Sequence, residues 1–309
     1  MRKHKHGNVI PRLMTSAVVM LLSFVVRVVA CEPVCSGMSQ SCPLCPVTYT
    51  PADSTKVMQL LDAACRQPAD TDYILFFARR LIGTPYVAHT LEVNDVERLV
   101  VNLRQLDCTT YVETVIALSM CMRNADFTFE SYCRNLRTLR YIRDTEPLYT
   151  TRLHYFTLWI EDNTLKGLCA EQQQPDPPFT EVQTVSASYM TTHPDRYRML
   201  ANNAADIPGI RAQEESITGR TYRYIPQDMI DNSPLLRSVI HDGDVIAIIT
   251  TIDGLDTQHI GIAVWHDDGL HLLNASSIHK KVVEEPLTLR QYLQRHKTMP
   301  GIRVLRLTL

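Results

Sequence analysis

Residues 106–122 read LDCTTYVETVIALSMCM, a short polar stretch that leads directly into an apolar run with helical spacing. Val112, Val115 and Ile116 recur at the i, i+3 and i+4 intervals of one helix face, which predicts a helix over 109–122. Cys108 would then lie at the N-terminal end of that helix, where the dipole and free backbone N–H groups favour the thiolate. A buried structural cysteine suits the same position, so position alone leaves both roles open.

The segments on either side predict helices first and strands later. Helical spacing predicts further helices over 56–65, capped by residues 52–54, over 70–82 and over 129–139. Alternating or β-branched runs between turn residues predict strands over 244–251, 259–266, 270–275, 281–283 and 303–307. Helices followed by an antiparallel meander indicate an α+β fold. Residues 145–234 are rich in Pro, Asn, Asp and Tyr, which predicts loop-rich insertions whose short elements wall a cleft.

The first 30 residues have the three parts of an export signal. A basic start precedes an almost wholly apolar run over 13–26, and Val-Val-Ala30 ends in a small residue. The apolar run is shorter than the roughly 20 residues that span a membrane. The sequence Val-Val-Ala-Cys31 resembles the bacterial lipobox, in which the cysteine is lipid-modified, and ordinary cleavage after Ala30 is the alternative. We therefore predict an exported protein of the bacterial cell envelope, with a linker over 31–50 and one domain over 51–309.

Charge and cysteine usage argue against two classes of function. The chain has 31 Lys and Arg against 33 Asp and Glu, and five of these basic residues lie in the predicted signal, so the remainder is acidic. No concentrated basic face for nucleic acid is visible there. Cys42-Pro-Leu-Cys45 has no second Cys-x-x-Cys pair, as structural zinc sites usually have. The cysteines over 31–45 therefore predict a local disulfide or thiols in a tether, and no metal.

A cysteine nucleophile needs a base, and His259 is the best-placed histidine. It opens the predicted strand 259–266 directly after a turn, which fixes its backbone at the rim of the sheet. If this strand and 270–275 form a hairpin about 4.8 Å apart, Asn274 returns near His259 and its amide oxygen can accept the Nδ1–H. Cys108, His259 and Asn274 are thus a candidate triad, although histidine near a turn and asparagine ending a strand are both common.

Several segments around these residues resemble a known group of cysteine hydrolases. LDCTTYV (106–112), GDVI (243–246), HIGIAV (259–264) and LLNAS (272–276) resemble the NlpC/P60 superfamily, which shares a papain-like core. GTPYVAHTLE (83–92), RLHYF (152–156), GRTY (219–222), GLD (254–256) and MPGIR (299–303) resemble one branch, the DUF1460 family, described as N-acetylmuramoyl-L-alanine amidase-like. The resemblance implies a helical half, with the nucleophile Cys108 at a helix N-terminus, packed on an antiparallel sheet that bears His259. The third polar residue is often histidine in the superfamily, and Asn274 can orient His259 but cannot carry charge.

What the resemblance implies is hydrolysis of the amide between N-acetylmuramic acid and L-Ala, on soluble peptidoglycan fragments that end in a 1,6-anhydro sugar. Cys108 thiolate would attack the carbonyl, and His259 would protonate the leaving amine and then activate water. The backbone N–H of Cys108 and the hydroxyl of Tyr86 are the candidate oxyanion donors. We expect a monomer that needs no cofactor or nucleic acid and meets the membrane only through a lipid on Cys31.

Three other residues are weaker candidates for substrate contacts. Asp107 precedes the nucleophile and equally suits a helix cap. Glu92 ends the GTPYVAHTLE segment and equally suits a solvated surface acid. Ser276 ends the LLNAS segment.

Three alternatives to the amidase remain open. An endopeptidase on the same fold would cut within the stem peptide, and product mass separates the two activities. A non-catalytic wall-binding lipoprotein, whose triad is a relic because of Asn274, would bind fragments without turnover. A zinc-dependent amidase would lose activity with a chelator, and no ligand set in the sequence supports it.

Overall fold

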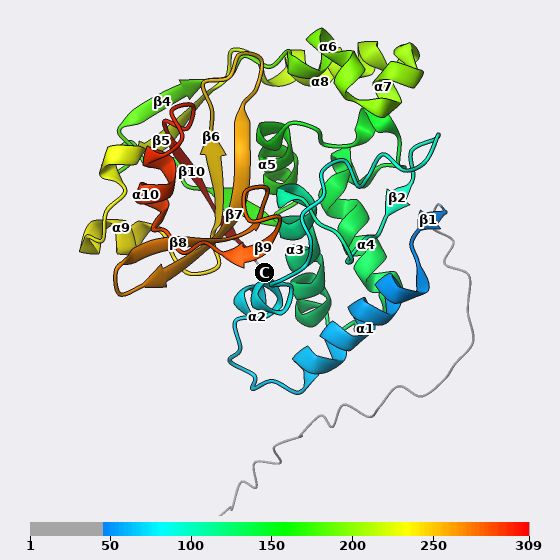
Figure 1. Cartoon of the computed structure of the whole chain (residues 1–309), viewed down its shortest axis with the longest axis horizontal. Helices are drawn as coiled ribbons and strands as arrows, with labels where there is room; N and C mark the ends of the chain where they lie inside the picture. Colours follow the sequence, from blue (N-terminus) through cyan, green and yellow to red (C-terminus); the bar gives the residue numbers. More distant parts are fainter. Residues whose placement is uncertain (1–45, 309) are drawn as a thin grey trace, which may run out of the picture. The chain divides into compact units, whose positions relative to one another are not determined.

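The computed structural model describes residues 46–308, so the predicted signal, Cys31 and nearly all of the predicted linker lie outside the described residues. Four helices come first, namely α1 (Pro51–Cys65), α2 (Tyr73–Arg80), α3 (Cys108–Arg123) and α4 (Phe129–Arg140). Five strands come last, namely β6 (Val245–Ile249), β7 (Thr257–His266), β8 (Gly269–Ser276), β9 (Lys281–Glu284) and β10 (Gly301–Leu307). The predicted order of helices before an antiparallel sheet is confirmed (Figure 1). None of the helices over 46–308 has the length and apolar character needed to cross a membrane.

Polar residues at the helix starts fix where the helices begin. Asp107 caps α3, because its Oδ1 accepts the N–H of Thr110 at 2.8 Å while the Thr110 hydroxyl accepts the N–H of Asp107 at 2.9 Å. Cys108 is therefore the first residue of α3. The predicted cap of the first helix is wrong, since Thr50 caps α1 and Asp53 lies in its first turn, where it accepts the Thr50 N–H at 2.9 Å.

Strands β3 to β10 form one sheet whose two faces are covered by different helices. Its strand order is β4 (Glu181–Thr184), β5 (Thr221–Pro226), β10, β6, β7, β8 and β9, with β3 (Cys169–Glu171) also pairing with β10. Val245 and Ala247 of β6 pack in a cluster with α1 to α4, whereas Ile246 and Ile248 pack with α9 (Pro234–Val239) and α10 (Leu289–Gln294). Figure 1 shows α3 and α5 on one side of β6 and β7, and α10 on the other. The central strands, above all β6, are thus buried on both faces, which explains the continuous apolar run of β6.

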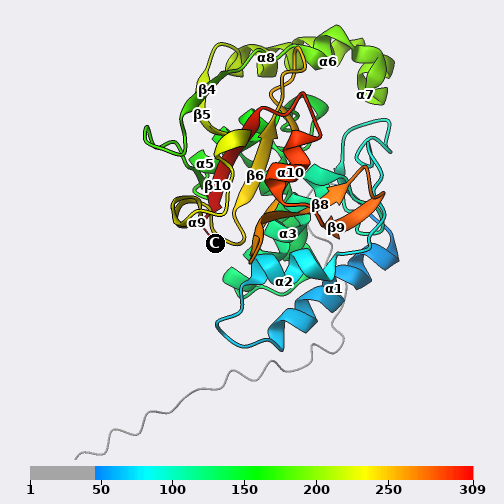
Figure 2. The same ribbon diagram turned by 60° about the vertical axis from the view of Figure 1, so that its left-hand side comes forward.

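The middle segment is more regular than the predicted loop-rich insertion. It holds α5 (Phe156–Leu165), α6 (Tyr189–Thr192), α7 (Arg198–Asn202), α8 (Ile207–Ile217), β3, β4 (Glu181–Thr184) and β5 (Thr221–Pro226). Helix α5 escaped prediction because buried residues lie on several of its sides, among them Phe156, Thr157 and Asp162, which removes the amphipathic pattern. Figure 2 shows α6, α7 and α8 at the end of the sheet away from α1 and α2.

Shorter elements complete the described part of the chain. Strands β1 (Val47–Thr48) and β2 (Leu99–Val100) pair in parallel. The 3₁₀ turns are η1 (Ile142–Asp144), η2 (Tyr149–Thr151), η3 (Pro194–Arg196), η4 (Ala204–Asp206) and η5 (Gln227–Met229).

Strand β7 is irregular just before His259. Ile249 pairs with Thr257 but Ile248 pairs with His259, so Gln258 is an extra residue in the ladder. A bulge of this kind bends the strand and redirects nearby side chains. The prediction that His259 opens the strand is therefore wrong by two residues. Two positions further on, a Cβ on Gly261 would lie 2.6 Å from Leu272 Cγ, so only glycine lets β7 and β8 approach this closely.

Candidate active site

Cys108 and His259 line one pocket of about 160 Å³ between the start of α3 and the start of β7. The α3 side contributes Cys108 and Thr109, and the β7 side contributes residues 255–260. The remaining wall comes from the middle segment, through residues 154–156, Met190 and Tyr197. The middle segment thus walls a cleft, as the sequence indicates.

Asn274 lies behind His259 and holds its ring. The Nε2–H of His259 donates to Asn274 Oδ1 at 3.0 Å, and Asn274 Nδ2 donates to the carbonyl of Leu272 at 3.1 Å, which fixes the amide orientation. The predicted contact with Nδ1 is wrong. Because β7 and β8 pair Ile262 with Leu273, Asn274 is diagonal to His259 and meets the far nitrogen of the ring. In the neutral ring, Nδ1 is then the basic nitrogen.

The environment of His259 keeps its ring neutral near pH 7. His259 is buried, and the ring of Tyr292 from α10 lies 6.4 Å from it, centroid to centroid. Burial lowers the pKa of His259 below its ordinary value, against smaller opposing effects of the Asn274 hydrogen bond and the charge of Glu285. The unprotonated form that a general base requires is therefore the resting form.

Cys108 rests as a thiol rather than as the thiolate that the helix start favours. Burial raises the pKa of Cys108 to about 12, and the neighbouring charge of Asp107 adds to the increase. The N–H of Thr109, a donor of the kind predicted at the helix start, lowers this pKa, as does the N–H of Ile260 on β7, which was not predicted, but burial outweighs both. The pair in the pocket is thus a thiol beside a neutral imidazole.

Two backbone hydrogen bonds connect the residues on either side of Tyr86 to Leu106, two positions before Cys108. The N–H of Leu106 donates to Pro85 O at 3.0 Å, and the N–H of Val87 donates to Leu106 O at 3.1 Å. Burial, followed by the charges of Cys108 and Asp107, raises the pKa of Tyr86 to about 12. The phenol therefore keeps its proton and remains a hydrogen-bond donor, although Tyr86 is not among the described residues that line the pocket.

Asp107 and Ser276 are both engaged within the protein. Asp107 Oδ1 accepts the backbone N–H and the hydroxyl of Thr110, each at 2.8 Å, so Asp107 is the helix cap that the sequence offered as its second reading. Ser276 is buried, and its hydroxyl accepts the N–H of His279 at 3.1 Å in the turn after β8. A substrate contact by either residue stays a prediction.

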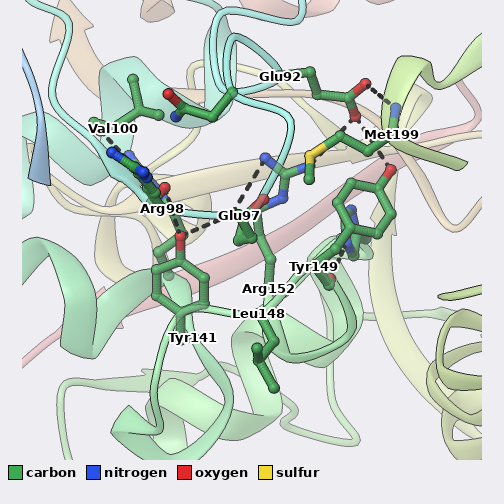
Figure 3. Close-up of polar contacts among 12 residues, drawn as sticks. Glu92, Glu97, Arg98, Val100, Tyr141, Leu148, Tyr149, Arg152 and Met199 are labelled. Atoms are coloured by element: carbon green, nitrogen blue, oxygen red, sulfur yellow. Dashed lines mark hydrogen bonds and ion pairs between the residues drawn. The ribbon is translucent and has the colours of Figure 1, made fainter. Parts of the chain in front are cut away.

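Glu92 is buried in a polar network (Figure 3), so the reading as a solvated surface acid is wrong. Its Oε1 accepts the hydroxyl of Tyr149 at 3.1 Å and Arg152 at 3.3 Å, and its Oε2 accepts the N–H of Met199 at 3.3 Å. Arg152 also forms an ion pair with Glu97 at 3.7 Å. These bonds tie the segment after Tyr86 to η2 and α7, and a substrate contact by Glu92 stays a prediction.

Sequence reasoning gave no role to His154, although it lies within the RLHYF segment. His154 lines the pocket, and its Nε2–H donates to the carbonyl of Tyr149 at 2.7 Å. Burial and the charge of Arg152 hold the pKa of His154 well below its ordinary value, so its Nδ1 is a neutral acceptor. Only the tertiary position shows this role, because nothing in the neighbouring sequence distinguishes His154 from other histidines.

Gly254 joins the middle segment to the turn before His259. Its carbonyl accepts the N–H groups of Ser188 and Tyr189, both at 3.0 Å, at the start of α6. The φ of Gly254 is +77°, and a Cβ there would lie 2.9 Å from Tyr189 N, so both conformation and space require glycine.

Residues 76–302 match the family described as AmiA-like, N-acetylmuramoyl-L-alanine amidase-like. The chain therefore belongs to this amidase-like family, and the DUF1460 assignment is confirmed.

Three solved structures illustrate the likeness. The crystal structure of an N-acetylmuramoyl-L-alanine amidase from Bacteroides uniformis is 36% identical with a TM-score of 0.70, and the match covers 77% of this chain and 98% of that chain. A candidate xylanase from Bacteroides fragilis is 37% identical with a TM-score of 0.69, over 75% of this chain and 99% of that chain. A DUF1460 protein from Legionella pneumophila is 22% identical with a TM-score of 0.65, over 83% of this chain and 94% of that chain, which concerns the fold alone. No curated protein matched the chain.

Proposed function

We propose that this protein is a cysteine-dependent N-acetylmuramoyl-L-alanine amidase that hydrolyses 1,6-anhydro-muropeptides between the sugar acid and L-Ala. The observation that carries the proposal is the single pocket lined by Cys108 and His259, with Asn274 holding the imidazole. The likeness to the Bacteroides uniformis amidase over nearly all of that chain supports the same bond. The proposal includes a papain-like core of the NlpC/P60 kind and an exported monomer with lipidated Cys31.

The chemistry follows from the protonation states of the pair. As the sulfur of Cys108 attacks the amide carbonyl, Nδ1 of His259 takes the thiol proton, and the new S–C bond yields a tetrahedral oxyanion. The Cys108 N–H has no partner within α3 because it is the first helical residue, so it can stabilise this oxyanion together with the Tyr86 hydroxyl. The imidazolium then protonates the leaving L-Ala nitrogen as the C–N bond breaks. His259 next takes a proton from water, which attacks the thioester and releases the acid and the thiol.

The pocket does not suit a glycosidase, the activity in the name of the Bacteroides fragilis relative. Glycoside hydrolysis commonly uses two carboxyl groups, one on each side of the scissile bond. Asp256 is the one carboxylic acid among the described residues that line the pocket. Both of its oxygens are engaged, Oδ2 by the N–H of Thr157 at 2.6 Å and Oδ1 by the N–H of Thr257 at 2.8 Å.

The direct test is product identification. The mature protein is incubated with a purified anhydro-muropeptide, and the products are identified by mass spectrometry. Release of a free peptide that begins with L-Ala supports the proposal. Cleavage within the stem peptide would instead indicate an endopeptidase, and bound but unchanged substrate would indicate a wall-binding protein. The same muropeptide with a reducing sugar tests the preference for the anhydro form.

Tyr86→Phe is expected to lower kcat by about 10²–10³-fold with a smaller change in KM, because an oxyanion donor acts mainly in the transition state. Steady-state kinetics on the anhydro-muropeptide would measure both constants. Tyr49→Phe, at an exposed tyrosine before α1, is the control and should leave both unchanged. A loss of less than about threefold in kcat would exclude Tyr86 as an oxyanion donor.

The dependence of kcat/KM on pH should report His259 and not a free thiolate. The pKa of His259 is lowered by burial, so activity is lost only as the pH falls below the ordinary histidine value. Because the pKa of Cys108 is raised to about 12, no further rise is expected between about pH 7 and pH 9, where an ordinary thiol ionises. A profile that climbs through this range would show that a thiolate formed independently of His259 is the reactive species.

A further inference from the structure

The mechanism requires a positive imidazole, yet the residue that holds His259 is uncharged. Asn274 accepts the Nε2–H of His259 and offers no negative charge when His259 takes the thiol proton. An imidazolium that forms in a buried site is costly unless a carboxylate lies near it. Two carboxylates, those of Glu285 and Asp107, favour the charged form of His259.

Glu285 lies on the same face of the sheet as His259 and Asn274. Its N–H donates to the carbonyl of Leu272 at 2.9 Å, the same carbonyl that accepts Asn274 Nδ2. This bond extends the pairing of β8 with β9, so Glu285 is opposite Leu272 and shares its face. Leu272 packs with Tyr292 of α10, the ring that stacks on His259.

The carboxylate of Glu285 is buried, and its charge acts on the imidazole of His259. Glu285 is 3% exposed, and its Oε2 makes no hydrogen bond to any residue over 46–308. Oε2 lies 3.2 Å from Nε2 of the exposed His279, a pair that carries charge on both sides only when His279 is protonated. The charge of Glu285 raises the pKa of both His259 and Tyr292, consistent with a position close to both rings.

We propose that Glu285 is a positioning residue that supplies the negative charge for the His259 imidazolium, a role that Asn274 cannot fill. This inference rests on the proposed role of His259 as the general base. The other ionisable groups whose charge acts on His259 are Asp107, at the start of α3, and His296, which follows α10. Tyr292 of α10 contacts the His259 ring, and Cys108 lines the same pocket. Of these, Asp107 favours the imidazolium and His296 opposes it, and Asp107 is already the cap of α3.

The kinetic test compares Glu285→Gln with Glu284→Gln. Glu284 is the matched control because it is opposite Leu273, faces the other side of the sheet and forms ion pairs with Arg79 and His266. Glu285→Gln is expected to lower kcat/KM about tenfold and to move the acidic limb of the pH profile to lower pH. Glu284→Gln should change neither. Adding Asn274→Asp to the Glu285→Gln variant restores a negative charge next to the His259 ring. The double variant should move the acidic limb of the pH profile back to higher pH.

A second measurement needs no turnover. In the Cys108→Ala background, the proton on the carbon between the two ring nitrogens of His259 can be titrated by NMR, with assignment by loss of the signal in His259→Gln. Glu285→Gln is expected to lower the pKa of His259, and Glu284→Gln to leave it unchanged. An equal pKa in the two glutamine variants would overturn the inference. A failed amidase assay would overturn the proposed function and leave this titration as a separate result.

Discussion

Cys108→Ala is expected to lower kcat/KM on the anhydro-muropeptide by about 10⁴–10⁶-fold, because loss of the nucleophile removes the covalent route and leaves only binding and the oxyanion donors. The side chain lies at the first position of α3, whose cap is made by Asp107, so the helix itself should persist. Mass spectrometry of the released peptide at long incubation times would measure the residual rate.

Two further variants separate the nucleophile from a merely structural cysteine. Cys65→Ala changes a cysteine at the end of α1, outside the pocket, and should retain full activity. Cys108→Ser keeps the shape of the site but provides a far weaker nucleophile, so it should bind the fragment and turn it over very slowly. Activity of Cys108→Ala within about tenfold of the unmodified protein would reject the covalent mechanism.

Arg140→Met is expected to lower the free energy of unfolding by about 3–5 kcal/mol, the usual cost of leaving a buried charge without its partner. Arg140 and Glu113 are both nearly inaccessible, and Arg140 Nε lies 2.8 Å from Glu113 Oε2. Arg140 also donates to the carbonyl of Val100 at 2.7 Å, so its loss leaves this carbonyl and Glu113 Oε2 without their donor. Glu113 is on α3, the helix that begins at Cys108. Urea unfolding monitored by circular dichroism would give the free energy.

The control uses a less buried arginine on the same helix. Arg137 is partly buried and forms an ion pair with the exposed Asp144 at 3.0 Å, and Arg137→Met should cost less than about 1 kcal/mol because Asp144 remains solvated. Adding Glu113→Gln to Arg140→Met removes the stranded charge and should recover part of the loss. If Arg140→Met were no more destabilising than Arg137→Met, the buried pair would not stabilise the fold.

The parts of the site that depend on local pattern were predictable. The apolar spacing after Cys108 located α3 to within a residue, and the turn after Trp265 located the hairpin that carries His259 and Asn274. The choice of ring nitrogen was not predictable, because it depends on the bulge at Gln258 and on the register of β7 against β8.

The residues around the catalytic pair depend on contacts distant in sequence. Glu92 looked like a surface acid because its partners, Tyr149, Arg152 and Met199, lie 57 to 107 positions away. The pKa of Cys108 also depends on such distant contacts. The helix start, which lowers this pKa, can be read from the sequence, but the burial that raises it more strongly cannot.

The hydrogen bonds to the carbonyl of Gly254 affect how the pocket responds to a bound ligand. Ser188 and Tyr189, at the start of the α6 wall, both donate to the carbonyl of Gly254, which lies five residues before His259. A ligand that displaces this wall should therefore also displace the backbone that leads to His259. A ligand that fits the pocket poorly should lose contacts of its own and also misalign the imidazole of His259. Discrimination between substrates should therefore appear in the catalytic rate as well as in affinity.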